Sequence, residues 1–167
     1  RYLTVGADHD RAGAVIWAAA GKNAATLSAF YEELGPERCA RLEAVSLDMG
    51  AAYRSATTNH APRAAQCIDP FHVIKLANTA VDEVRRAQVR ALGGLADAQQ
   101  AIKKTRWILL KAEENLTGKD IAKLALVAAA NRPLYRAYLL KETLRAVYRE
   151  PAHKAKEKLA AWLAWAS

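Results

Sequence analysis

The chain has 167 residues, of which 52% are hydrophobic, so it is long enough to bury a core in one domain or in a domain with a helical extension. Lysine and arginine outnumber aspartate and glutamate by 25 to 17, and the formal net charge of +8 favours a polyanionic partner, with nucleic acid first. The alternative is a basic protein without such a partner. A membrane span needs about 18 consecutive apolar residues, and no apolar run in the sequence is that long. We also recognise no signal peptide. We therefore expect a cytoplasmic protein that contacts no membrane.

The two cysteines, Cys39 and Cys67, lie far apart, and neither belongs to a CxxC motif or a histidine cluster. We therefore expect no zinc site and interpret both as small, buried apolar side chains in a reducing cytosol. Glycine-rich phosphate loops, GxSxG elbows, HExxH motifs and Cys/His nucleophile pairs are also missing from the sequence. The residues thus give no support to a hydrolase or a nucleotide-binding protein. The chain opens inside a strand pattern and stops after a tryptophan-rich helix, so we expect a piece of a longer protein.

The first third of the sequence predicts a β-hairpin followed by a helix. Residues 1–7 and 14–19 have strand character, and the Asp-His-Asp-Arg-Ala-Gly segment between them supplies the turn. Residues 27–34 then carry apolar side chains at helical spacing until Gly35 and Pro36 end the pattern.

Two short apolar runs that end in aspartates predict buried strands. They extend from Ala44 to Asp48 and from Ala64 to Asp69, and residues 51–58 between them predict a short helix. Alternating strands and helices are typical of an α/β mixed sheet with parallel neighbours and flanking helices. We expect the two runs to be adjacent parallel strands, with the hairpin on the same sheet.

The rest of the sequence is predicted to be helical. A long helix is expected from Phe71 to Arg90, and the glycine pair at 93–94 is the clearest internal break. We therefore divide the chain into an α/β part, residues 1–91, and an all-helical part, residues 92–167. Within the second part we expect helices over 120–130, 133–149 and 151–165, with prolines in the first turns of the last two.

Asp48 is the candidate catalytic residue that the pattern alone suggests. A carboxylate just past an apolar parallel strand stands where α/β sheets place ligand sites, although such a residue also caps turns and helices. Asp8 and Asp10 are paired in a hairpin turn, where aspartate commonly bonds to the local backbone, so we interpret them as structural. Asp69 precedes Pro70 and is a natural helix N-cap.

The helix that starts near Pro70 has a polar and basic face. His72, Lys75, Arg85 and Arg86 lie on it, and such a face is suited to contact with DNA phosphates. The alternative is a solvated helix surface, which runs of charge usually are.

Short strings along nearly the whole chain carry a further signal. In residues 1–91 they are Arg1-Tyr2-Leu3-Thr4-Val5, Asp8-His9-Asp10, Trp17-Ala18-Ala19, Thr26-Leu27, Val45-Ser46-Leu47-Asp48-Met49, Tyr53, Ile68-Asp69-Pro70-Phe71-His72-Val73-Ile74-Lys75, Asn78, Val81-Asp82 and Val84-Arg85-Arg86. In the helical part they are Arg106, Leu109-Leu110, Asn115-Leu116-Thr117, Leu139-Leu140-Lys141-Glu142 and Leu144-Arg145. In this order and spacing they resemble transposases of the insertion-sequence L-three family, which are of the DDE type. The Asp-x-Phe-His-x-x-Lys stretch is the strongest part of the resemblance.

The resemblance implies a partial RNase H-like core over residues 1–91 and a helical insertion over 92–167. Family members cleave and join DNA strands during transposition, with three acidic residues that bind two divalent metal ions, magnesium or manganese. Asp48 matches the second of these acidic residues. The first would lie upstream of Arg1 and the third beyond Ser167, so we expect this chain to be inactive by itself.

The same resemblance implies further expectations about partners. The full protein would bind transposon ends and target DNA, form a homo-oligomer, and act in the bacterial cytoplasm at the nucleoid. The competing hypothesis is a non-catalytic DNA-binding or oligomerisation module, such as a decayed transposase remnant.

Overall fold

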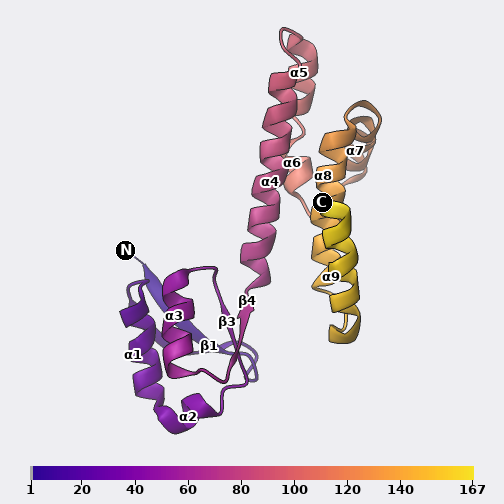
Figure 1. Cartoon of the computed structure of the whole chain (residues 1–167). Helices are drawn as coiled ribbons and strands as arrows, with labels where there is room; N and C mark the ends of the chain where they lie inside the picture. The colour runs from indigo at the N-terminus through magenta and orange to yellow at the C-terminus, as the bar shows by residue number, and fades with distance from the viewer. Residues whose placement is uncertain (1) are drawn as a thin grey trace. The chain divides into compact units, whose positions relative to one another are not determined.

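The structure is a computed structural model that describes residues 2–167. The chain divides into two compact units, the first ending at His72 and the second extending from Val73 to Ser167 (Figure 1). The glycine pair at 93–94, where we expected a domain boundary, lies inside the second unit. Val81 of the long helix packs in one hydrophobic cluster with residues such as Ile108 and Leu124, which explains why most of this helix belongs to the helical unit.

The first unit opens with the expected hairpin. Strands β1 (Leu3–Asp8) and β2 (Ala14–Ala20) are antiparallel, with a bulge between Gly6 and Ala7. The Asp8 carboxylate accepts a hydrogen bond of 3.0 Å from the Asp10 backbone, which is the structural role expected of a turn aspartate.

The two runs that end in aspartate form the expected parallel pair, but the prediction that both strands are buried is wrong, because every residue of the second strand is exposed, Cys67 included, and only Leu47 of the first is buried. Strand β3 (Ala44–Leu47) pairs with β4 (Ala65–Ile68), from Ala44 opposite Ala65 to Leu47 opposite Ile68. The prediction that the hairpin shares this sheet is wrong, because among the described residues β1 bonds only to β2 and β3 only to β4. Alternating strands and helices indicate how many strands to expect, but not which strand edges bond to each other.

Three helices complete the first unit. Helix α1 (Ala24–Leu34) is capped by Asn23, and the helices α2 (Pro36–Ala40) and α3 (Ala51–His60) follow. The hydroxyls of Tyr31 on α1 and Thr57 on α3 are 2.8 Å apart and buried, which fixes the two helices side by side (Figure 1). The buried core consists of Leu27, Tyr31, Cys39, Leu47, Ala56, Ala61 and Ala64.

Helix α4 (Pro70–Ala91) carries the chain into the second unit, as predicted after Pro70. The short elements α5 (Ala96–Lys103), α6 (Arg106–Leu110) and the 3-10 helix η1 (Glu113–Asn115) come next. They are followed by α7 (Gly118–Ala130), α8 (Arg132–Val147) and α9 (Ala152–Ala166), which match the three predicted helices closely. Pro133 lies in the first turn of α8, whereas Pro151 directly precedes α9.

The second unit has its own core between the helices. Lys141 of α8 is 2% exposed, and its ammonium group donates hydrogen bonds of 2.6 Å to the carbonyl oxygens of Leu109 and Lys111 at the end of α6. The short helix α6 is thereby fixed on α8. No helix in the described part combines the length and apolar character needed to cross a lipid bilayer. The main core cluster contains Val81, Ile108, Leu109, Leu124, Val127, Leu134 and Tyr138.

Candidate functional site

Asp48 follows β3 directly and starts the turn into α3. Its Oδ1 atom accepts a hydrogen bond of 2.8 Å from the backbone N–H of Gly50, and its side chain is half-buried. A Cβ atom built at Gly50 would lie 2.7 Å from the same oxygen, which is closer than real Cβ contacts come. The backbone N–H of Gly50 therefore orients the Asp48 carboxylate, and the lack of a side chain at Gly50 leaves room for that carboxylate.

Asp69 follows the neighbouring strand at the same edge of the parallel pair. Its backbone N–H donates to the carbonyl oxygen of Leu47 at 2.8 Å, so the ladder continues one residue past the strands. Its Oδ1 atom accepts from the N–H of Phe71 at 2.8 Å, which makes Asp69 the N-terminal cap of α4 as predicted. The Nε2 atom of His72 lies 4.0 Å from the other oxygen, Oδ2.

A carboxylate is the ligand type that magnesium prefers, and Asp48 has the appropriate chemistry. Among residues 2–167, however, no three histidine, cysteine, aspartate or glutamate side chains are grouped to hold a metal ion. The described residues therefore do not form a complete metal-binding set by themselves.

The polar face of α4 has Asp82 at its centre. The Nε and Nη2 atoms of Arg85 lie 2.8 and 2.7 Å from Asp82 Oδ1, and those of Arg86 both lie 2.8 Å from Oδ2. A third guanidinium group comes from α6, where Arg106 Nε is 3.5 Å from Oδ1. Burial raises the pKa of Asp82, but the hydrogen bonds and charges of Arg85 and Arg86 outweigh burial and hold that pKa below its ordinary value.

The predicted DNA-contacting residues differ in their surroundings. Lys75 and Arg86 are exposed and His72 is half-buried, whereas Arg85 is 8% exposed and bonded to Asp82. Helical periodicity placed Arg85 on the polar face of α4, but it could not show that neighbouring residues bury part of this face.

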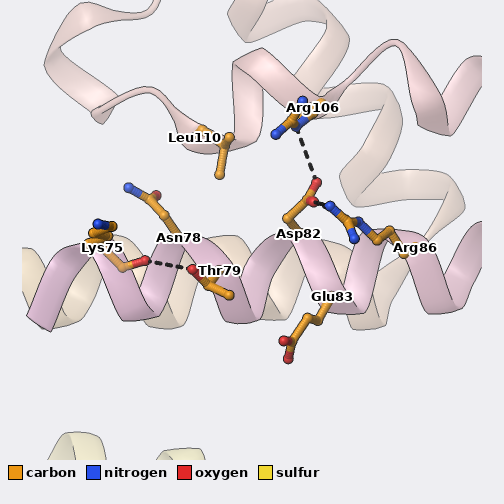
Figure 2. A pocket seen from close by; sticks show the side chains of 8 residues that line it. All are labelled: Lys75, Asn78, Thr79, Asp82, Glu83, Arg86, Arg106 and Leu110. Atoms are coloured by element: carbon orange, nitrogen blue, oxygen red, sulfur yellow. Dashed lines mark hydrogen bonds and ion pairs between the residues drawn. The ribbon is translucent and has the colours of Figure 1, made fainter.

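A pocket of about 280 Å³ lies over this face, between α4 and α6 (Figure 2). Figure 2 shows Asn78 and Lys75 from α4 on one side and Arg106 and Leu110 from α6 on the other. Sequence reasoning gave no role to Arg106 or Asn78, because the contact between α4 and α6 joins segments that lie far apart in the sequence. The lining residues are Lys75, Asn78, Thr79, Asp82, Glu83, Arg86, Arg106 and Leu110.

A transposase family model of the insertion-sequence L-three, DDE type matches residues 1–167. The chain belongs to this transposase family. The resemblance found in the sequence strings is thereby confirmed.

The curated relatives of this chain are also transposases of insertion sequences. This transposase chain is 37% identical over 187 residues to the transposase for insertion sequence element IS1557 of Mycobacterium tuberculosis, with 99% of the chain and 42% of the relative covered. It is 35% identical over 155 residues to the transposase for insertion sequence element IS1001 of Bordetella parapertussis, with 91% and 38% covered. The chain thus spans about two fifths of the length of these relatives. No solved structure matches the transposase chain.

Proposed function

We propose that this transposase chain contributes Asp48 as one of the three metal-binding carboxylates of a DDE enzyme that cleaves and joins DNA strands. The observation that carries the proposal is the place of Asp48. It stands at the C-terminal end of a strand in a parallel pair, with one carboxylate oxygen oriented by the Gly50 N–H. The bond to Gly50 is the same kind of turn bond that Asp8 makes to Asp10, so the proposal depends on the position of Asp48 at the end of a parallel strand and not on that bond.

The cofactor in this proposal is a pair of magnesium or manganese ions. When bound, such ions activate the attacking oxygen and stabilise the leaving oxygen of a phosphodiester. Asp48 would bind the metal through its carboxylate. The remaining ligands of the metal would come from residues outside this chain. The Gly50 N–H keeps Oδ1 oriented, which leaves Oδ2 as the oxygen without a hydrogen-bond partner among the described residues.

The DNA contacts in this proposal belong to the polar face of α4. The ammonium group of Lys75 and the guanidinium group of Arg86 are exposed and suited to phosphate oxygens, and His72 stands in the first turn of the same helix. Arg85 is bonded to Asp82, and we place it in the scaffold that holds the other two side chains. The partners would be transposon ends and target DNA in the bacterial cytoplasm, with a homo-oligomer as the acting form.

For the architecture we propose a partial RNase H-like core over residues 1–91 and a helical insertion over residues 92–167. The parallel pair and the helices α1 and α3 support the first part, in which the hairpin forms a sheet of its own among the described residues, and the run of helices from α5 onward supports the second.

The competing function is a non-catalytic DNA-binding or oligomerisation module. The observation that favours it is the basic pocket of α4 and α6, which is suited to phosphates without any catalytic step. A catalytic role for Asp48 separates the two hypotheses, because a binding module needs no such carboxylate.

The first experiment is a nicking and strand-transfer assay of this chain with magnesium or manganese. We expect no turnover, because one carboxylate cannot hold two metal ions. Clear turnover that Asp48→Ala leaves unchanged contradicts the proposed role of Asp48 and the expected inactivity.

A further inference from the structure

The pocket between α4 and α6 has more positive than negative charge at its centre. Among the residues that line the pocket, the carboxylate of Asp82 faces the guanidinium groups of Arg86 and Arg106. Glu83 and Lys75 add one charge of each sign, so the lining has one positive charge in excess. The lining therefore favours an anion.

The two exposed arginines keep hydrogen-bond donors available for a ligand. Arg86 uses Nε and Nη2 for Asp82, and Arg106 uses Nε, so within the described chain Arg86 Nη1 and both Nη atoms of Arg106 have no protein partner. Their side chains are 61% and 45% exposed. The Arg106 guanidinium carbon also lies 4.8 Å from the centre of the Trp107 ring, a cation–π contact that restrains its position. Planar guanidinium groups held in this way match phosphate oxygens with two donors at once.

Asn78 supplies an independent sign of a ligand. Its Oδ1 atom is buried and has no hydrogen-bond partner in the part of the chain that the structure describes. Figure 2 shows this side chain extending from α4 towards α6, beside Lys75. A phosphate oxygen only accepts hydrogen bonds and therefore cannot pair with Oδ1, but an amide turned by half a rotation would place Nδ2 there, and Nδ2 can donate to a phosphate oxygen.

We propose that this pocket is a phosphate-binding site for the DNA backbone, in which Arg106 of α6 acts together with Arg86, Lys75 and Asn78 of α4. The inference rests on the proposed function, because it takes DNA as the partner. The backbone of a polyanion is favoured over a small phosphate because the basic side chains extend along α4, from Lys75 to Arg86, three helical turns apart. Asp82 is the positioning residue that orients both arginines.

The test is fluorescence anisotropy of a random-sequence duplex with the full chain, measured across a series of salt concentrations. Arg106→Gln and Arg86→Gln should each lower the slope of log affinity against log salt by about 0.9, the value for one lost phosphate contact. Each should also weaken binding about tenfold at low salt, as expected for a lost hydrogen bond to a charged group. Arg106→Lys should keep the slope, because the charge remains, and still lose affinity, because the planar fork is gone.

The matched control is Arg132→Gln on α8. Arg132 is exposed, lies outside the pocket and has no ion pair within the described residues, so the variant changes the net charge equally. Circular dichroism melts verify that each variant is folded. Equal slopes for the parent chain and both pocket variants, or an equal loss in Arg132→Gln, overturn the proposal.

A second arm separates the two sources of phosphate. Inorganic phosphate should displace the duplex no better than sodium chloride of the same ionic strength. Specific displacement means that the pocket takes a small phosphate, and this also overturns the proposal. Failure of the pocket does not affect the proposed role of Asp48, since Asp48→Ala should leave the salt slope of this chain unchanged and should alter strand transfer by a transposase that contains the chain.

Discussion

Asp82 shows how one residue organises the proposed DNA-binding face. Asp82 is 7% exposed, and its carboxylate is the ion-pair partner of the buried Arg85 as well as of the exposed Arg86. Removal of a buried partner leaves an uncompensated charge, whereas removal of an exposed partner loses a pair that solvent already screens.

We therefore expect Asp82→Ala to lower the free energy of unfolding by about 3 kcal/mol and Arg86→Ala by less than about 1 kcal/mol. Urea denaturation of the whole chain, monitored by circular dichroism, measures both values. Similar losses of unfolding free energy in the two variants would show that Asp82 is not needed to compensate the charge of the buried Arg85.

Gly50 gives a second prediction at the residue scale. Its backbone has φ −69° and ψ 125°, so alanine is allowed there, but the added Cβ would lie 2.7 Å from Asp48 Oδ1. Gly50→Ala should change stability by less than about 1 kcal/mol. It should reduce strand transfer by a transposase that contains this chain, because the Asp48 carboxylate must move. Thermal melts and the transfer assay provide the two measurements, and full activity in this variant would contradict a fixed carboxylate.

The sequence predicted the place of Asp48 better than the surroundings of Arg85. An apolar run that ends in aspartate is a local signal, and β3 bears it out. The burial of Arg85 depends on Asp82 and on residues packed over α4, and no pattern within one helix contains that information.

The N-terminus of α7 is the clearest case in which a short motif builds an element. Thr117 and Asp120 form a reciprocal capping box, and Lys111 Nζ donates to Asp120 Oδ2 at 2.7 Å. The hydrogen bond from Lys111, followed by those from the Thr117 backbone and side chain, lowers the pKa of Asp120 to about 2.

The motif leads to a prediction about mutation and pH. Thr117→Ala should cost about 1 kcal/mol of unfolding free energy, the typical value of an N-cap. Because the folded pKa of Asp120 is the lower one, its contribution is complete above the unfolded value of 3.8 and is lost as pH falls towards about 2. Melting temperatures of the parent chain and Asp120→Asn should converge over this interval. A constant difference down to pH 2 would contradict the lowered pKa.

At the scale of elements, sequence reasoning succeeded for long or strongly bounded segments. The hairpin, the parallel pair, α4 and the three last helices were predicted close to their observed bounds. The helices α2 and α6 have five residues each, which is too few for apolar side chains to repeat at helical spacing, so the sequence contains no signal for them. The sequence could not predict that the hairpin and the parallel pair form separate sheets, because strand register and the pairing of sheet edges depend on tertiary contacts.

At the scale of the molecule, the chain combines two units with separate cores. The first contains Asp48 and the second contains the basic pocket. In the proposed function these units have different tasks, one in metal binding and the other in holding the DNA backbone. The two tasks are separable by experiment, since the residues that carry them belong to different units.

The most direct test of the account is strand transfer by a transposase in which this chain replaces the matching segment of the IS1557 relative. Asp48→Asn should lower the rate roughly a thousandfold, as expected when several kcal/mol of metal-dependent stabilisation is lost. Asp69→Asn is the matched control, because Asp69 follows the neighbouring strand but caps α4, and it should retain activity within about tenfold. Near-full activity of Asp48→Asn, or equal losses in the two variants, would contradict the assignment of Asp48 as a metal-binding catalytic carboxylate.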